Sequence, residues 1–451
     1  MAQFELSVEF LEELRDAVEK VESDKVKAIL DELYPADITS VLYEMESDEC
    51  KYIFDILDKE VDAQILSYID EDTRTKFLRN FESKEIAEML EYVDSDDAAD
   101  ILNEQPLRMR EEVIGFIENK EKASNILDLL RYEEDTAGSL MAKEFVMANI
   151  NWNVKHCIDE IRNQTVSLEK LYSVYVIDEN EALVGRVSLK KIILGTDYTK
   201  ISEIYEDDVM YVETWMSSEE VADIMQKYDL DSIPVVNVQK KLVGMVTIDD
   251  VVDIIKARQE LDRQAMAGIT EDIEEDDSIW MLTRARLPWL LIGMIGGLTG
   301  ASLIGMFEHN LVLIPAMAFF IPLITATGGN VGVQSSSIVV QSLANRTFFA
   351  QNIGYRLLKV LLVGLINGLV LSGLVFAANL FLGQPMQLAL VVSIALLSVV
   401  LLASVMGTVT PLVLDHYGIN PAVASGPFIT TTNDLLGLAV YFSVASLLYS
   451  I

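Results

Sequence analysis

The sequence predicts a multi-domain protein: an all-α N-terminal domain of repeated short helices, an α/β domain of two related halves, a connecting helix, and a membrane domain of five helices. Three observations predict this fold class. Short amphipathic patterns fill residues 5–135, a strand-strand-helix pattern occurs twice between residues 171 and 255, and long uncharged apolar stretches are confined to the region after residue 285.

The charge of the chain is distributed very unevenly. Only 3 of the 71 acidic and 5 of the 34 basic residues follow residue 280, so the first 280 residues carry 68 acids and 29 bases, a net charge of −39. A region this acidic repels nucleic acid, and we expect no nucleic-acid partner. It attracts cations such as Mg²⁺ or Ca²⁺, although an acidic solvated surface explains the charge equally well.

Neither a zinc site nor a disulfide framework is expected. Cys50 and Cys157 are far apart, and the three histidines lack metal-binding spacing. The first residues are acidic and amphipathic and contain no basic segment followed by an apolar core. We therefore predict no signal peptide and a cytoplasmic N-terminus.

Residues 1–135 are predicted to form a cytosolic helical domain, because helix-start signals recur roughly every dozen residues. These signals are Ser47-Asp48, Asp58, Asp70 with Asp72-Thr73, Ser83, and Ser95-Asp96. Helices this short cannot bury a face alone, so we expect them to stack into an array. Asp96 and Asp100 lie four residues apart on one helix face, where carboxylates repel unless a cation or a basic partner separates them. Helix capping by Ser95 and Asp96 is the alternative, and it leaves Asp100 unexplained.

The segments 136–199 and 200–256 are predicted to be two copies of one β-β-α unit. Strands are expected at residues 171–177 and 182–189, and again about 60 residues later at 231–237 and 242–248. The duplication resembles a tandem pair of CBS domains, a regulatory module associated with nucleotide or ion sensing. A polar helix is then expected up to about Gly268, followed by the acidic run 271–277. This connecting segment, 257–285, is interpreted either as the route by which the pair signals to the membrane or as a solvated linker.

The membrane domain, residues 286–451, is predicted to contain five spans. The uncharged stretches are 289–307, 311–345, 360–414 and 421–448, and the third is long enough to turn back once, at residues 382–385. Pro315, Pro322 and the pair Gly328-Gly329 predict a kink or break in the second span. All five basic residues fall before the first span or in the loop after the second. The sequence therefore predicts a multi-pass plasma-membrane protein with its N-terminus inside and its C-terminus outside.

Asp434 is the main candidate site residue. It follows the polar run 430–433 in an otherwise apolar segment, and a carboxylate at membrane depth normally faces protein, water or an ion. The alternative is a helix cap, since Thr, Asn and Asp also mark helix N-termini. Gly328, Gly329 and Asn330 lie in a second polar strip that is predicted either to line an ion pathway or to pack helices closely. One carboxylate with carbonyl and amide oxygens suits Mg²⁺, Ca²⁺ or Mn²⁺.

Four segments together resemble the MgtE family of Mg²⁺ channels. They are residues 133–141, 286–290, 328–336 and 420–434, and the likeness covers nearly the whole chain in order. The resemblance implies a homodimer in the lipid membrane whose pore, formed chiefly by the second and fifth spans, holds a hydrated Mg²⁺ at Asp434. It also implies that cytosolic Mg²⁺ bridges the N-terminal domain, the CBS pair and a connecting "plug" helix and closes the pore.

The regulatory acids that the resemblance transfers to this chain are Asp96, Asp100, Glu219, Asp229, Asp250 and Asp262. Other positions depart from the family pattern: Lys256 and Arg258 replace acids, and Ser217 and Asn420 stand where Asp is common. Bases cannot bind Mg²⁺, so the gate is expected either to close at higher Mg²⁺ or to use Lys256 and Arg258 in place of the ion. Weakened inhibition by Mg²⁺ is the favoured hypothesis.

Nucleotide binding is a separate hypothesis. Gly244, Thr247 and Asp250 have the Gly-x-x-Thr-x-x-Asp form that CBS pairs use for a ribose, whereas the first repeat has Lys191 at the acid position, so ATP is a possible ligand. Alternative functions are a broader transporter of Mn²⁺, Co²⁺ or Ca²⁺ and a membrane-anchored CBS sensor. The sequence contains no catalytic triad, P-loop or cofactor motif, and no enzyme activity is expected.

Overall fold

The computed structural model describes residues 6–164, 171–273, 277–344, 353–424 and 426–449. The chain forms two compact units, residues 1–255 and 256–451, and the boundary falls within helix α16 (Ile248–Ala267). Two features used in the sequence analysis lie outside the described residues: Arg346, which is one of the five basic residues after residue 280, and the acids 274–276.

The N-terminal domain consists of ten short helices. They are α1 (Val8–Glu19), α2 (Ser23–Leu30), α3 (Pro35–Leu42), α4 (Ser47–Ile56), α5 (Lys59–Tyr68), α6 (Glu71–Leu78), α7 (Ser83–Leu90), α8 (Ser95–Asn103), α9 (Leu107–Phe116) and α10 (Lys120–Leu129). From α2 to α9 every helix begins 12 residues after the one before it. The predicted helical repeat is confirmed, and its period is regular.

An acidic residue precedes most of these helices. Asp58 and Asp70 are N-cap residues as predicted, whereas Ser47, Ser83 and Ser95 are the first helical residues and follow N-caps Glu46, Glu82 and Asp94. The carboxylate of Asp70 accepts from the N–H of Thr73 at 2.9 Å, and Glu46 and Glu82 belong to capping boxes. At Asp58 and Asp94 the negative charge favours the positive end of the helix dipole without a side-chain capping bond.

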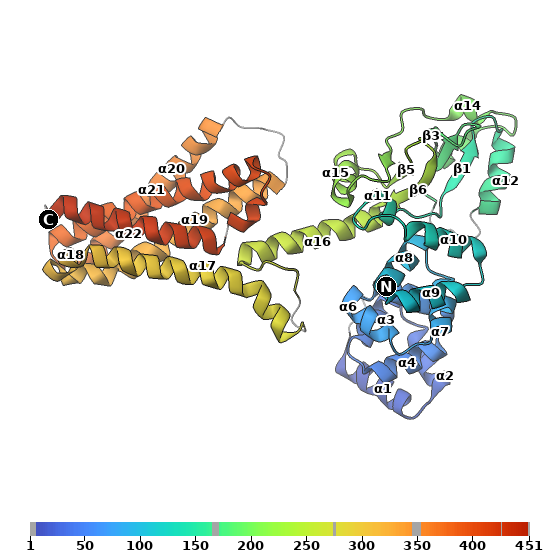
Figure 1. Ribbon diagram of the computed structural model, residues 1–451, viewed down its shortest axis with the longest axis horizontal. Helices are drawn as coiled ribbons and strands as arrows, with labels where there is room; N and C mark the ends of the chain where they lie inside the picture. Colours follow the sequence, from blue (N-terminus) through green and yellow to red (C-terminus); the bar gives the residue numbers. More distant parts are fainter. Residues whose placement is uncertain (1–5, 165–170, 274–276, 345–352, 425, 450–451) are drawn as a thin grey trace. The chain divides into compact units, whose positions relative to one another are not determined.

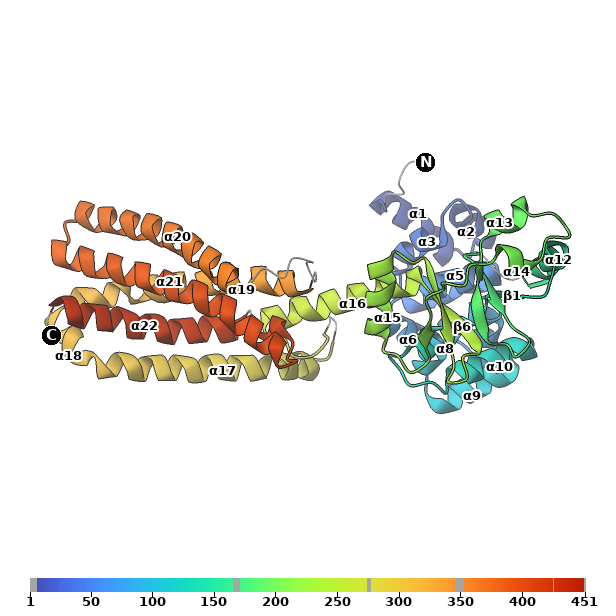
Figure 2. The ribbon, with the colours of Figure 1, turned by 90° about the horizontal axis from the view of Figure 1, so that it is seen from above.

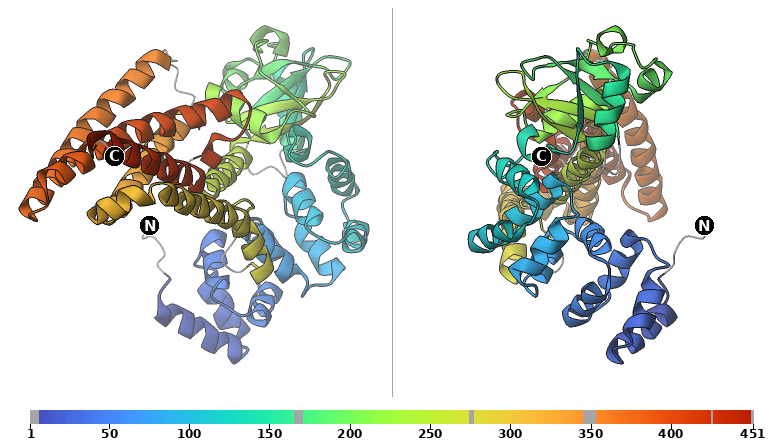
Figure 3. Two further views of the ribbon diagram at one scale, coloured as in Figure 1. Left: turned by 60° about the vertical axis from the view of Figure 1, so that its left-hand side comes forward. Right: turned by 90° about the vertical axis from the view of Figure 1, so that its right-hand side faces the viewer.

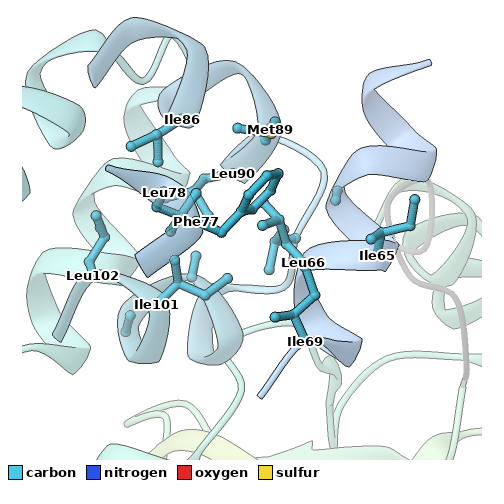
Figure 4. Close-up of a cluster of buried hydrophobic side chains, with 14 of the residues drawn as sticks. Ile65, Leu66, Ile69, Phe77, Leu78, Ile86, Met89, Leu90, Ile101 and Leu102 are labelled. Atoms are coloured by element: carbon cyan, nitrogen blue, oxygen red, sulfur yellow. The ribbon is translucent and has the colours of Figure 1, made fainter. Parts of the chain in front are cut away.

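Helices two apart in sequence pack together. One row contains α3, α5, α7 and α9, and another contains α6, α8 and α10. The structural unit is therefore a pair of helices, and each pair covers the apolar face of the next. Figure 4 shows the resulting core, in which Phe77 lies among Leu66, Leu90 and Ile101. The left-hand view of Figure 3 shows the blue and cyan helices of this array below the green strands.

The α/β domain contains two three-stranded sheets of identical topology. In the first, β1 (Val146–Asn149) pairs parallel with β2 (Val174–Ile177), which pairs antiparallel with β3 (Leu183–Val187). In the second, β4 (Val212–Glu213), β5 (Ser232–Val236) and β6 (Leu242–Thr247) repeat that order. The helices of this domain are α11 (Ala137–Leu140), α12 (Val154–Gln164), α13 (Leu189–Leu194), α14 (Ile201–Ile204), α15 (Ser218–Tyr228) and the start of α16.

The predicted duplication is confirmed in atomic detail at the turns. Asp178 Oδ1 accepts from the N–H groups of Asn180 and Ala182, and Asn237 Oδ1 accepts from those of Gln239 and Lys241. These side-chain turns hold each strand pair in the same register. Strands β1 and β4 were not predicted, because they have only four and two residues and lie away from the repeated pattern.

Unit 256–451 is helical. After α16 it contains α17 (Ile279–Met306), α18 (Glu308–Leu313), the 3-10 helix Pro315–Phe320, α19 (Ile321–Ala344), α20 (Ile353–Phe381), α21 (Met386–His416), the 3-10 helix Pro421–Ala424 and α22 (Pro427–Tyr449). Within the described residues five helices are long and apolar enough to span a membrane, as predicted (Figure 1).

The turns and breaks between these spans agree partly with the prediction. The chain reverses at residues 382–385, as predicted, with Gly383 at a positive φ of 74°. The second span is interrupted at Pro315, where a 3-10 helix forms. The pair Gly328-Gly329 does not break α19, which is continuous, because neighbouring helices pack against these glycines.

Helices α21 and α22 form the core of this unit. Met317, Val399, Tyr441 and Phe442 belong to one buried cluster, and the Tyr441 hydroxyl donates to the carbonyl of Met317 at 3.0 Å. Figure 2 shows α22 between α17 and α21. The helix that carries Asp434 is therefore central.

Candidate ion pathway and acidic cluster

Asp434 is the eighth residue of α22, which begins at Pro427. At 1.5 Å per residue it is about 10 Å from the helix start. A residue this far into the helix cannot cap it, and the hydroxyl of Thr430 donates instead to the carbonyl of Gly426 at 3.3 Å. The capping interpretation of Asp434 therefore loses its geometric basis.

The carboxylate of Asp434 lies beside Gly329 of α19. A Cβ atom on Gly329 would be 3.6 Å from Asp434 Oδ1 and 3.2 Å from the methyl group of Thr430. Thr430 and Asp434 are both partly exposed, although Asn433 between them is buried. The second and fifth spans are thus in contact at the predicted polar segments, and Asp434 lies at the partly exposed edge of this contact.

The three predicted residues of the glycine strip have different surroundings. Gly328 is buried, and a Cβ atom there would be 2.9 Å from Val399 of α21, which is a packing position. Gly329 faces the side chains of Thr430 and Asp434, and Asn330 is exposed. Of the strip, Gly329 is nearest to Asp434, and close helix packing accounts for Gly328.

The segment before α22 is bound to the end of α16. Asn420 donates from Nδ2 to Asp262 Oδ1 at 2.9 Å, and its Oδ1 accepts from the N–H of Ala422 at 2.8 Å. A Cβ atom on Gly426 would be 2.3 Å from the carbonyl oxygen of Met266. Side-chain and backbone contacts therefore both fix residues 262–268 against the start of α22.

A second candidate site lies between the N-terminal and α/β domains in unit 1–255. A cavity of about 150 Å³ is lined by acids from α8, from the loop before β1 and from the start of α16. The lining residues are Asp94, Asp96, Asp97, Ala142, Glu144, Tyr172, Met245, Thr247, Asp249 and Asp250. The predicted residues Asp96 and Asp250 are therefore brought together from positions 154 residues apart.

The crowding of these acids raises their pKa values. Burial, the Asp250 charge and the Asp97 charge raise the pKa of Asp96 well above its usual range. Desolvation, followed by the charges of Asp97 and Asp250, raises the pKa of Asp100 to about 7, although part of that residue remains solvent-accessible. Burial raises the pKa of Asp250 to about 6 against two hydrogen bonds from Thr247 that lower it. A cation placed among these groups would relieve the repulsion.

Glu144 is an important member of this cluster that the sequence analysis missed. It accepts hydrogen bonds from the backbone N–H of Ser95 at 3.3 Å and from the Ser95 hydroxyl, and so joins the α/β domain to the start of α8. Glu144 lies in a loop without periodicity, so no local pattern distinguishes it.

Two fixed cations lie close to the same acids. Lys122 donates to the carbonyls of Glu91 and Val93, and burial lowers its pKa although Glu144 and Asp94 oppose that shift. Arg74 pairs with Glu104 and lies within electrostatic range of Asp97 and Asp100. Part of the negative charge is therefore balanced by the chain itself.

Asp100, which is exposed on α8 beside the cluster, and the remaining predicted regulatory residues do not line this cavity. Glu219 is exposed in the first turn of α15, and Asp229 ends that helix in a left-handed conformation with φ of 53°. Ser217 caps α15 by accepting from the N–H of Glu220 at 3.3 Å. Lys256 and Arg258 occupy exposed positions of α16.

Across the residues that the structure describes, no group of three or more His, Cys, Asp or Glu side chains is arranged to hold a metal ion. Mg²⁺ is nevertheless compatible with both sites, because it keeps several waters and is commonly bound through one or two carboxylates. The buried Oδ1 of Asp96, which has no hydrogen-bond partner among the described residues, fits such an ion.

Family profiles match three parts of the chain. "MgtE intracellular N domain" matches residues 33–135, "CBS domain" matches 137–195 and 201–257, and "Divalent cation transporter", named MgtE, matches 321–444. The magnesium transporter MgtE of Enterococcus faecalis is 36% identical over 329 residues, 72% of each chain. The chain belongs to the MgtE family.

Other members agree with this assignment. The MgtE magnesium transporter of Thermus thermophilus is 35% identical over 322 residues, 71% of each chain. The crystal structure titled as the cytosolic domain of the Mg²⁺ channel MgtE in complex with ATP has a TM-score of 0.51 and 29% identity, and covers 54% of this chain and 99% of that one. The protein is therefore a multi-pass membrane transporter of the MgtE family and not an enzyme, and the predicted fold class is confirmed.

Proposed function

We propose that this MgtE family member is a Mg²⁺-selective channel for magnesium uptake with Asp434 as its pore acid. The position of Asp434 beside Gly329, where the polar segments of α19 and α22 meet, carries this proposal. A carboxylate attracts the ion, while a strongly hydrated Mg²⁺ can keep its waters and bind through them. Gly329 leaves room beside the carboxylate, and Gly328 and Asn330 complete the strip.

The pore is shared by two subunits of a homodimer. Asp434 and Thr430 remain partly exposed on the single chain, although they lie within a span. A charge at that depth is unfavourable against lipid, so a second protein surface should cover it. A two-fold axis beside α22 would supply the carboxylate twice. With the N-terminus in the cytosol, five spans place the C-terminus outside the cell.

Cytosolic Mg²⁺ closes this channel by binding at the acidic cluster of Asp96, Asp100 and Asp250. Their raised pKa values support this role, because repulsion would drive the N-terminal and α/β domains apart without a cation. Glu219, Asp229 and Asp262 are assigned to further regulatory contacts on the family resemblance.

Inhibition by Mg²⁺ is weakened in this chain. Lys256, Arg258 and Ser217 cannot bind Mg²⁺ as carboxylates do. Asn420, which stands where Asp is common in the family, forms a hydrogen bond with Asp262 without an ion. Part of the closed contact therefore forms at any Mg²⁺ concentration, and the ion adds less to closure.

ATP is proposed as a ligand of the CBS pair. The crystal structure of the related cytosolic domain contains ATP, and Thr247 and Asp250 have the pattern for holding a ribose. The hydroxyl of Thr247 donates to Asp250 Oδ2 at 2.9 Å, so both side chains are already oriented at the start of α16. Heat released on titrating the full-length protein with ATP, and its loss in Thr247→Val, tests this ligand.

Growth of a Mg²⁺-auxotrophic bacterium on low Mg²⁺ tests the main proposal. The wild type and Asp415→Asn, which changes another acid of the same unit at an exposed position, should restore growth, and Asp434→Ala should not. Restored growth by Asp434→Ala at equal expression would contradict a channel role and favour a membrane-anchored CBS sensor. Equal currents of Mn²⁺, Co²⁺ or Ca²⁺ through the wild type would instead indicate a broader transporter.

A further inference from the structure

Glycines hold the central helix α22 in place on two sides. A Cβ atom on Gly296 of α17 would be 1.9 Å from the methyl group of Thr431, and a Cβ atom on Gly332 of α19 would be 1.8 Å from Asn433 Nδ2. Real Cβ atoms do not approach so closely, so these side chains occupy space that only glycine leaves. The rotation of α22 about its axis is therefore fixed by Thr431 and Asn433.

The position of Asn433 is more restricted than that of Thr431. It is 2% exposed, and the backbone of Gly332 against which it lies is itself covered by α21, since a Cβ atom on Gly407 would be 2.3 Å from the carbonyl oxygen of Gly332. Neither Nδ2 nor Oδ1 of Asn433 has a hydrogen-bond partner among the described residues. An amide is thus inserted between three helices without a compensating bond.

Stability alone does not favour an amide in this place. An apolar side chain of similar size would fill the space without the cost of desolvating two polar atoms. The amide does have two properties that leucine lacks: its end is planar and thin enough to lie against a glycine backbone, and it is polar. Both properties bear on the next residue, because adjacent helical residues point about 100° apart.

We propose that Asn433 is a positioning residue for ion selectivity, which acts by setting the direction of the Asp434 carboxylate. This proposal rests on the pore role of Asp434 stated above. The planar amide enters the notch at Gly332 and prevents rotation of α22, so that Asp434 remains beside Gly329. A small rotation of α22 would move the carboxylate along the pore wall and change its distance from a hydrated ion.

The role of Asn433 can be tested in the full-length dimer in liposomes. Asn433→Leu removes both the thin planar end and its polarity, and should lower the ratio of Mg²⁺ to Ca²⁺ flux by about threefold to tenfold, the effect of one misplaced hydrogen bond between Asp434 and the hydrated ion. Ser393→Ala removes a different buried polar group without a partner among the described residues, a hydroxyl on α21, and should leave that ratio unchanged.

A double substitution tests the notch itself. Gly332→Ala should lower the flux ratio because its methyl group would collide with Asn433. Asn433→Ala in the same chain should lower the ratio little further, since the contact between the two residues is already lost. Additive losses in the two variants, or an unchanged flux ratio in Asn433→Leu, would overturn the proposal.

The outcome for Asp434 separates this inference from the proposed function. If Asp434→Asn alters the flux ratio while the Asn433 variants do not, only the positioning role is wrong. If Asp434→Asn also has no effect on the flux ratio, the pore assignment itself fails.

Discussion

At the scale of single residues, the acidic cluster makes the stability of the protein depend on pH. The folded-state pKa values of Asp100 and Asp250 are about 7 and about 6, against about 3.9 for an unfolded aspartate. Between these values the folded chain binds more protons than the unfolded chain, so the free energy of unfolding falls as pH rises from about 4 to about 7.

We therefore expect the full-length protein without Mg²⁺ to unfold at a lower temperature at about pH 7.5 than at about pH 5.5. Added Mg²⁺ should raise the midpoint more at the higher pH, because only ionised carboxylates bind it. Thermal unfolding at both pH values, with and without Mg²⁺, measures this difference. A larger Mg²⁺ effect at the lower pH would contradict the assignment.

Asp62 provides a matched control for that measurement. It is a fully buried acid of α5 whose pKa burial raises to about 7 despite its ion pair with Lys59. The charges that add to this shift are those of Asp55 and Asp58, whereas Asp100 is affected by Asp97 and Asp250 of the acidic cluster. Asp62→Asn and Asp100→Asn should both reduce the dependence of stability on pH. Only Asp100→Asn should also reduce the Mg²⁺ effect.

The sequence analysis proposed Asp434, Asp96 and Asp100 from local patterns and Asp250 from the family resemblance, but not Glu144 or Asn433. An acid in an apolar span and two acids one helical turn apart are local signals. Glu144 acts through Ser95, 49 residues away, and Asn433 acts through a glycine on another helix. Their roles depend on tertiary contacts, which one sequence does not specify.

At the scale of elements, the contact between α16 and the start of α22 should respond to a one-atom change. In Asn420→Asp two carboxylate groups would meet where Asn420 now donates to Asp262, while the bond from the N–H of Ala422 would be kept. We expect the open probability without cytosolic Mg²⁺ to rise about fivefold, corresponding to about 1 kcal/mol for a partly exposed bond. Patch recordings across a Mg²⁺ series measure this, and added Mg²⁺ should restore closure.

Exchanging the two side chains is the control for this prediction. The double variant Asp262→Asn with Asn420→Asp again pairs one amide with one carboxylate, so closure without Mg²⁺ should return. If the double variant gates like Asn420→Asp alone, the hydrogen bond is not the closing contact.

Element boundaries were predictable where local chemistry sets them. Acid-capped starts predicted the helices of the N-terminal domain, and Gly383 with Pro385 predicted the turn between α20 and α21. The break predicted at the pair Gly328-Gly329 was wrong, because glycine favours a break only where no neighbouring helix packs against its backbone. In α19 these glycines are covered by Val399, Thr430 and Asn433 instead.

At the scale of the whole molecule, the question is how many subunits contribute to one pore. Partial exposure of Thr430 and Asp434 within a span led us to propose a shared pore. A pore inside each subunit is the competing arrangement, and the two differ in how one defective subunit affects its partner.

Covalently linked dimers with none, one or two Asp434→Asn substitutions distinguish these arrangements. If each subunit contains its own pore, the singly substituted dimer should carry about half of the wild-type Mg²⁺ current with unchanged selectivity. If both carboxylates face one hydrated ion, losing one should reduce the current well below half and lower selectivity. Every Mg²⁺ ion then passes the same damaged site, where its affinity falls about tenfold per 1.4 kcal/mol of lost binding energy. Linked dimers with Asp415→Asn in one subunit should match the wild type, and a half-sized current with normal selectivity would rule out the shared pore.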